Sequence, residues 1–398
     1  MQLDYDILIA GGGLAGNCLA LALKDSGLNV AIIEAQTPQQ LKDSPAGDRA
    51  LALAAGTVNM LSALGAWQEI TTATPIKQIH ISDKGHFGKT RLSARQQGVD
   101  ALGYVICARD IETHVAKQVE QSGIKRFCPA RVIGLMSDNQ AVHVSLKDKD
   151  RPFSLSAALL VGADGGNSNV RKLLEIPQQI TEYGQTALVT TVKAALPHHN
   201  TAYERFTQSG PLALLPLSDH ELSVVWTRSH EDAKALTQSS ETEFLSQLQD
   251  CFGYKLGELS LAAPVRAFPL TLIRAERMLS GRTIIIGNAA HQLHPVAGQG
   301  FNLGLRDVVQ LAEMIQNQDD PGNPELLQQY AQNRQTDHDK TIAFTDTTVK
   351  IFSNNWLALA AVRNSGLTLL DHLPFAKKIL ARHAMGMAER LPRVGSKK

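Results

Sequence analysis

Short apolar runs alternate with amphipathic segments in the first part of the chain, as they do in parallel α/β proteins. Apolar runs at 6–10 and 30–33 flank a glycine-rich turn and a segment, 18–27, that has helical periodicity. A later apolar run at 159–164 ends in Asp164. Continuous apolar runs predict strands that are buried on both faces, and the periodic segment predicts the helix that connects the first two strands.

The middle of the chain changes to a period of two. Between 185 and 228, short alternating segments are separated by Pro, Gly and Asp, which predicts an antiparallel sheet. The segment 75–95 begins with a similar alternation and is expected to join this sheet. The run at 212–217 is so apolar that one face is expected to line an apolar pocket, although a plain core strand is the other interpretation. The residues expected at this pocket are Leu215, Pro216 and Trp226.

A strand, a glycine-rich loop and a helix are predicted again at 283–314. Residues 284–287 form the strand, Gly298 and Gly300 lie in the loop, and the helix is expected to begin near Asn302. A helix N-terminus presents unpaired backbone N–H groups and the positive end of a dipole, which together favour an anion. The glycines let the backbone approach a ligand, because they carry no Cβ.

The C-terminal part is predicted to be helical, with polar faces at 324–346 and an apolar face at 349–387. Lys377, Lys378 and Arg382 lie beside the apolar positions of the second segment. A helix docked on the body with a solvated charged face is the commoner structure for this pattern. Contact with an anionic membrane surface is the alternative.

Composition excludes several classes of function. The chain has 398 residues, 43% of them apolar, and a net charge of +1, which is ordinary for a globular protein of this length. From residue 346 onward the charge is +6, so the body carries −5, and nucleic-acid binding is not expected without a basic folded face. The four scattered cysteines predict reduced thiols, a cytoplasmic protein and no metal site. Neither a signal peptide nor a membrane-spanning run is expected.

The turn after the first strand carries a G-x-G-x-x-G motif at Gly11, Gly13 and Gly16. Gly11 allows the tight turn, Gly13 admits a pyrophosphate, and Gly16 allows the helix to pack closely on the strand. Glu34 ends the second strand, where it can accept a hydrogen bond from a ribose hydroxyl. An acidic residue there disfavours a 2′-phosphate, so FAD or NAD is predicted as the tightly bound dinucleotide rather than NADP.

Three further residues are weaker candidates for contact with this cofactor. Arg49 precedes a predicted helix and Arg109 begins another, so either arginine could contact the phosphates or flavin. A solvated surface position for Arg49 and a carboxylate partner for Arg109 are the alternatives. Asp164 lies at the carboxyl end of a predicted parallel strand, where open α/β sheets bind ligands, although an ordinary Asp-Gly turn also explains it.

Three motifs now stand together: GGGLAG with Glu34, GADGGNSNVR at 162–171, and IGNAAHQLHPVAGQGFNLGLRD at 286–307. Their combination resembles the aromatic-hydroxylase family of FAD-dependent monooxygenases, such as para-hydroxybenzoate hydroxylase, over almost the whole chain. The third motif is similar to the signature of the ubiquinone-biosynthesis branch of that family. Several other segments most resemble the 2-octaprenyl-6-methoxyphenol hydroxylases within this branch.

The resemblance implies a Rossmann-like FAD-binding domain, 1–180 and 265–345, interleaved with a mainly antiparallel β substrate domain, 181–264. A helical, basic C-terminal part, 346–398, would follow. It also implies that FAD reacts with NAD(P)H, bound only transiently, and with O₂ to form a flavin C4a-hydroperoxide. This species would hydroxylate a prenylated methoxyphenol ring in ubiquinone biosynthesis.

Roles for the third motif follow from the same resemblance. Gly287, Gly298, Gly300 and Asn302 are expected to hold the flavin, and Pro295 to face its ring. His294 would polarise or deprotonate the phenol, although it could equally only shape the loop. Asn288 stands at a position where the wider family has Asp. The methoxyphenol branch, like this chain, has Asn there. Asn288 retains an acceptor oxygen but loses a charge-assisted bond to the ribityl chain, which predicts weaker FAD retention.

Three other functions fit the same motifs. One is a sister flavin hydroxylase for another ring position or aromatic substrate. Another is a flavin-binding scaffold subunit in a quinone-biosynthesis assembly, and a plain NAD dehydrogenase is a more distant third. The expected partners are O₂, the prenylated phenol, other ubiquinone-biosynthesis proteins and the cytoplasmic face of a membrane.

Overall fold

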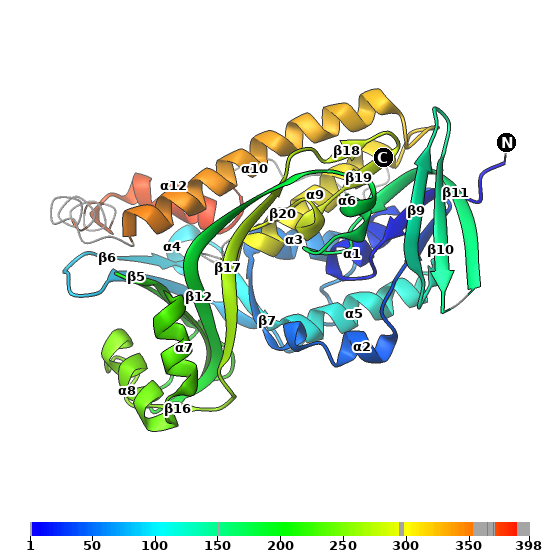
Figure 1. The fold of residues 1–398 in the computed structure, drawn as a ribbon. Coiled ribbons are helices and arrows are strands. Elements are labelled where there is room, and N and C mark those ends of the chain that lie inside the picture. The colour runs from blue at the N-terminus through cyan, green and yellow to red at the C-terminus, as the bar shows by residue number, and fades with distance from the viewer. Residues whose placement is uncertain are drawn as a thin grey trace.

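A computed structural model describes residues 2–149, 151–293, 298–352, 364, 369 and 371–387. Two large sheets organise the chain, one of eight strands with a parallel centre and one of nine mainly antiparallel strands. Figure 1 shows the two sheets with long strands running between them and the helix α10 (Pro324–Phe352) lying along the molecule. The α/β fold expected from the sequence is confirmed.

The first sheet has its parallel strands at the centre. Its main order is β18-β19-β11-β1-β2-β8, and β9 and β10 extend it next to β11. The strands are β1 (Tyr5–Ala10), β2 (Val30–Ile33), β8 (Lys125–Phe127), β9 (Arg131–Ser137), β10 (Val142–Asp148), β11 (Arg151–Gly162), β18 (Leu279–Ser280) and β19 (Thr283–Ile285). Four pairings in this sheet are parallel: β1 with β2, β1 with β11, β11 with β19, and β2 with β8. They bring the carboxyl ends of these strands to one edge of the sheet.

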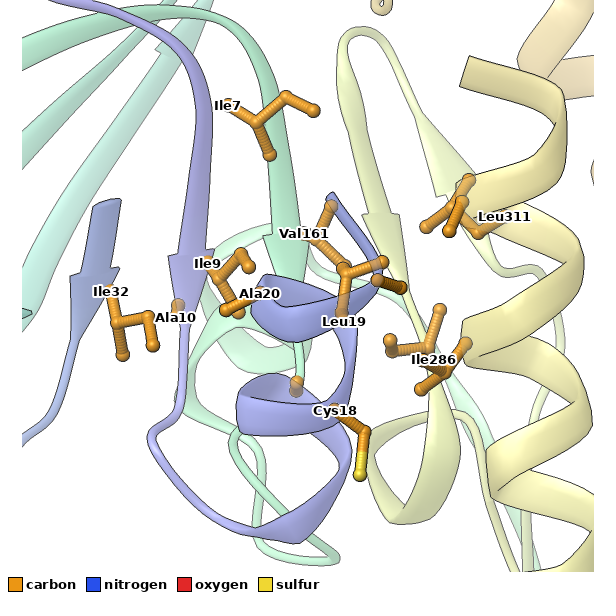
Figure 2. Packing of buried hydrophobic residues seen from close by; sticks show 14 of the residues in the cluster. Ile7, Ile9, Ala10, Cys18, Leu19, Ala20, Ile32, Val161, Ile286 and Leu311 are labelled. Atoms are coloured by element: carbon orange, nitrogen blue, oxygen red, sulfur yellow. The ribbon is translucent and has the colours of Figure 1, made fainter. Parts of the chain in front are cut away.

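The core of this half lies between the sheet and two helices, α1 (Leu14–Leu23) and α9 (Gln299–Ile315). Figure 2 shows Leu19 of α1 beside Ile286 and Leu311, with Ile9 on the sheet side. These four side chains are fully buried. Each such side chain contributes roughly 1.5–3 kcal/mol by its removal from water, so the core holds the glycine-rich turns in fixed positions.

The second sheet contains the alternating segments. Its order is β20-β17-β12-β15-β14-β13-β5-β6, with β16 beside β12. The strands are β5 (Gln78–Asp83), β6 (Lys89–Ser93), β12 (Gln178–Ala194), β13 (Thr201–Thr207), β14 (Gly210–Pro216), β15 (Glu221–Ser229), β16 (Leu259–Leu261), β17 (Arg266–Ala275) and β20 (His291–Gln292). Helices α7 (His230–Gln238) and α8 (Glu241–Phe252) pack on one face.

The structure differs from the expected pattern at three places. The alternating segment that begins at Ile76 is divided, because β4 (Thr74–Ile76) joins a small sheet with β3 (Ala50–Ala54) and β7 (Gly103–Cys107), whereas β5 joins the second sheet. The strand β17 pairs with β12, so the second sheet extends beyond the expected boundary at 264. Helix α9 begins at Gln299, slightly before the expected start near Asn302, and its N-cap residue Gly298 has a positive φ of 62°, which glycine adopts without strain.

The remaining helices and 3₁₀ turns complete the fold, and α3 and α5 add buried side chains to the core of the first sheet. They are α2 (Pro38–Lys42), the 3₁₀ turn η1 (Pro45–Asp48), α3 (Ala55–Ala63), α4 (Ala94–Gln97), α5 (Ala108–Gln121), α6 (Asn169–Leu173), the 3₁₀ turn η2 (Gly287–Ala289) and α12 (Pro374–Ala384). Within the described ranges, no helix combines the length and hydropathy needed to cross a membrane. The apolar segment 349–387 is described only in part, and α12 is its described helix.

Candidate functional site

A cavity of about 1200 Å³ lies where the two sheets meet. Its lining combines the glycine turn after β1, the ends of β2 and β11, the start of α9 and one face of the second sheet. Ordinary small-molecule sites have volumes of roughly 300–1000 Å³, so this cavity has room for a large cofactor together with a substrate ring.

The glycine turn after β1 opens directly into this cavity. Gly11 has a φ of 114°, which an L side chain rarely adopts. A Cβ on Gly13 would meet no atom within 4 Å, so the backbone here is bare toward the cavity. A Cβ on Gly16, in contrast, would overlap the carbonyl oxygen of Gly11. Gly16 therefore serves the packing of α1, and it does not line the cavity.

Glu34 is held in place by the turns around it. Its Oε2 accepts the Gly12 N–H at 2.7 Å, and its Oε1 accepts the Gln36 N–H at 2.7 Å. The side chain is buried but lines the cavity. Each carboxylate oxygen has a second lone pair, so Glu34 can still accept from a ribose hydroxyl. The bare backbone at Gly13 and this acidic group are what an FAD dinucleotide requires, so the residues fit that cofactor.

The start of α9 is fixed by a buried amide. Asn302 Oδ1 accepts from the Ala54 N–H at 3.0 Å and from Thr57 Oγ1 at 2.6 Å. Its Nδ2 donates to the carbonyls of Gly298, at 2.7 Å, and Ala52, at 3.2 Å. Asn302 thus positions the loop through all of these bonds. Gly298 and Gly300 line the cavity, and a Cβ on Gly300 would meet no atom within 4 Å.

The turn that follows β19 also lies at the cavity. Gly287 has a φ of 57°, and both it and the exposed Asn288 line the cavity, as the ribityl role of Asn288 requires. The two residues to which the sequence assigned catalysis, His294 and Pro295, lie outside the described residues. Their roles stay predictions.

Beneath this turn lies a charge cluster that was not predicted from the sequence. Asp307 of α9 is fully buried, and its Oδ1 accepts from Arg334 Nε at 2.7 Å and His338 Nε2 at 2.8 Å. Its Oδ2 lies 2.8 Å from His291 Nε2 and accepts the Gly287 N–H at 3.2 Å. The signal in the sequence was the i, i+4 spacing of two polar residues, 334 and 338, on one face of α10.

Electrostatics explain why this cluster is stable. Burial alone would raise the pKa of Asp307, but the neighbouring His338, Arg334 and His291 lower that pKa well below its ordinary value. Burial lowers the pKa of His291, although Asp307 opposes this. Asp307 and the two histidines place ligand atoms within 4.8 Å of one another, as at a metal site. The Arg334 guanidinium already neutralises the same carboxylate, so we assign the cluster to hydrogen bonding.

One face of the second sheet forms an apolar wall of the cavity, and it includes Leu215. Trp226 does not lie on this wall. It is fully buried on the opposite face, with its ring centroid 5.8 Å from that of Phe244 in α8. Successive side chains alternate across a strand, so the neighbouring Val225 faces the cavity instead. Pro216, at the end of β14, is buried and also lies off the lining.

The three weaker candidates have different positions. Arg49 lines the cavity, and Asp164 lines it while accepting the N–H groups of Asn169 and Val170 at 2.7 and 3.0 Å. Arg109 lies off the lining, because its Nη2 bonds Asp48 Oδ1 at 2.6 Å. Of the two interpretations of Arg109, the structure therefore supports pairing with a carboxylate rather than contact with the cofactor.

Comparisons with known proteins identify the family of this chain. Residues 4–345 match the FAD binding domain family. The chain is 34% identical over 392 residues to ubiquinone hydroxylase UbiL of Rhodospirillum rubrum, covering 96% of this chain and 89% of that protein. It is 28% identical to 3-demethoxyubiquinol 3-hydroxylase of Escherichia coli, covering 96% and 98%.

Solved structures share the fold. The p-nitrophenol 4-monooxygenase PnpA from Pseudomonas putida aligns with a TM-score of 0.79 and 18% identity, covering 98% of this chain and 100% of that one. The family match covers most of the chain, and a relative at 34% identity supports it over nearly full length. This chain therefore belongs to the FAD binding domain family and is an FAD-dependent aromatic hydroxylase.

Proposed function

We propose that this protein hydroxylates the ring of a prenylated methoxyphenol in ubiquinone biosynthesis, with NAD(P)H and O₂ as co-substrates. The observation that carries the proposal is one continuous cavity in which a dinucleotide turn faces an apolar sheet wall. Bound FAD would supply the oxygen-activating chemistry. The names of the ubiquinone hydroxylase relatives support the substrate class.

The residues of this chain would bind and orient the two molecules. Gly13 would admit the pyrophosphate, Glu34 would accept from the ribose, and Asn288 would accept from the ribityl chain. The N-terminus of α9, at Gly298 and Gly300, would stabilise negative charge on the flavin ring. The apolar wall would keep water from the reacting ring.

A polyprenyl tail requires an apolar exit, and we propose that the tail leaves the cavity beside α12. Leu380, His383 and Ala384 of α12 line the cavity, whereas Phe375 is 78% exposed on the surface. Ile379 is 45% exposed, and Lys378 and Arg382 share the same helix, whereas Lys377 pairs with Asp371 at 2.8 Å. An apolar surface with basic neighbours suits an anionic membrane, so we propose peripheral contact at the cytoplasmic face. Other ubiquinone-biosynthesis proteins would be the second class of partner.

The test is oxygen incorporation by the purified protein. With FAD, NADPH, ¹⁸O₂ and 2-prenyl-6-methoxyphenol, we expect substrate-stimulated NADPH oxidation and one labelled oxygen in the product. Bound flavin without labelled product would favour the scaffold function. Bound nicotinamide without flavin would contradict the FAD assignment.

Ring position requires a second experiment, the identification of lipids that accumulate when the gene is deleted in aerobically grown cells. A prenyl-methoxyphenol with loss of ubiquinone would support the proposal. A different prenylphenol would favour a sister hydroxylase, and an unchanged quinone pool would contradict the pathway.

A further inference from the structure

The apolar wall of the cavity contains one acidic side chain, Glu204 of β13. In the strand register it lies directly opposite Ala213 of β14 and Ile81 of β5, and both of these residues line the cavity. Ala202 and Phe206, two residues away on either side, line it as well. Glu204 therefore points from a hydrocarbon surface into the space that the substrate ring would occupy.

Glu204 makes no hydrogen bond or ion pair with any residue in the part of the chain that the structure describes. The charged residues of the neighbouring positions belong to the other face, since side chains alternate. Arg205 bonds Ser82 there, and His80 packs edge-on against Tyr203. The other titratable residues of the lining are Tyr203, which precedes Glu204 in β13, and, from other elements, Glu34, Arg49, Glu112, Arg131, Asp164 and His383.

A carboxyl group without a partner on an apolar wall is costly, because nothing replaces the water that it loses. Burial raises the pKa of Glu204 to about 7, from an ordinary 4.5. A group with such a pKa is partly ionised at neutral pH and is suited to accept a proton there. Destabilising features of this kind concentrate at functional sites, and no structural partner explains this one.

We propose that Glu204 accepts the hydrogen bond of the substrate's phenolic hydroxyl and, as a carboxylate, removes its proton. This inference rests on the proposed function. The O–H bond breaks, the proton moves to a Glu204 carboxylate oxygen, and the electron pair stays on the phenol oxygen. That charge spreads into the ring and makes its carbons better nucleophiles toward the oxygen supplied at the flavin.

The experiment compares two ligands and four proteins, all as FAD holoenzymes. The ligands are 2-prenyl-6-methoxyphenol and its O-methyl ether, which lacks the hydroxyl proton, and binding is followed by the change in flavin absorbance. The proteins are the wild type, Glu204→Gln, Glu204→Leu and a control, Glu258→Gln. Glu258 is an exposed carboxylate in the same half of the molecule.

We expect the wild type to bind the phenol about tenfold more tightly than the ether at pH 8, and to lose this preference below pH 6. Glu204→Leu should abolish the preference and Glu204→Gln should make it independent of pH. Hydroxylation by Glu204→Gln should fall about 100-fold. Thermal stability should not fall in either variant, because the carboxyl has no partner. The control should match the wild type.

Equal phenol preference and equal pH profiles in the wild type and both Glu204 variants would overturn the inference and leave the proposed function intact. A wild type that binds neither ligand and incorporates no oxygen would overturn the proposed function itself. A loss of thermal stability in Glu204→Gln together with an unchanged pH profile would assign Glu204 a structural role instead.

Discussion

Replacing Asp307 by Asn tests whether the buried charge cluster holds the flavin-side turn. The carboxylate accepts from Arg334, His338 and Gly287, and it is 0% exposed. Asn has the same shape but no charge, and one of its two ends is a donor. The substitution would leave the Gly287 N–H facing an amide donor and the Arg334 charge without its buried partner.

The expected loss of stability is about 3–5 kcal/mol, the usual effect of removing one partner from a buried ion pair. For a chain of this size, that corresponds to a fall of roughly 4–6 °C in Tm. The pKa of Asp307 lies well below its ordinary value of 3.8. A carboxylate with a lowered pKa contributes stability above its unfolded pKa and loses that contribution as pH falls through the folded value. The comparison is therefore made at pH 7.

Urea unfolding followed by circular dichroism measures this free energy, and fluorescence of released flavin measures FAD affinity, which should weaken at least several-fold. Asp232→Asn is the matched control, because its pair with Arg228 lies at 3.0 Å with Asp232 46% exposed. An exposed pair contributes less than about 1 kcal/mol. If Asp307→Asn were no more destabilising than this control, the reasoning about the cluster would be wrong.

Two further predictions concern the cavity, and a third concerns the exposed surface of α12. Gly13→Val should abolish FAD binding without unfolding the protein, since the valine side chain would enter open space that the pyrophosphate needs. Circular dichroism checks the fold and the flavin absorbance spectrum checks the cofactor, and a normal flavin spectrum in the folded variant would contradict the prediction. Because the pKa of Glu204 is raised to about 7, the native state keeps a proton on this carboxyl between pH 4.5 and about 7, and the free energy of unfolding should fall by about 1–3 kcal/mol as pH rises through that window. Glu204→Gln should flatten this part of the urea-stability profile, and an equal slope in both proteins would refute the prediction. Phe375→Asp with Ile379→Asp should reduce co-sedimentation with anionic vesicles several-fold while flavin content is retained, and unchanged sedimentation would favour a helix that only docks on the body.

Local rules of the chain determined most of the dinucleotide half. The strand at 6–10, the glycine turn and Glu34 belong to one short strand–helix–strand unit, so apolar runs and the G-x-G-x-x-G spacing were sufficient to predict their arrangement. The alternation between 185 and 228 predicted the second sheet for the same reason.

Facing direction and long-range pairing were decided only by the tertiary structure. Alternation along a strand shows that Leu215 and Trp226 each point to one face of the sheet, but it does not say to which. The fold decides this, because α8 covers the face that holds Trp226 and the cavity lies on the face that holds Leu215. Arg109 had two electrostatic partners open to it in sequence, and the fold brought Asp48 within 2.6 Å.

The partners of two further polar groups were also set only by the fold. Asp307 and His338 come from different helices, and their contact depends on how α9 and α10 pack. Glu204 resembles any strand carboxylate until Ala213 of the next strand and Ile81, which lies far away in the chain, form the wall around it. The sequence by itself therefore determined the cofactor turn and the fold class, because those depend on adjacent residues. The tertiary structure alone decided which side chains share the cavity, because burial and partners are set by segments that only folding brings together.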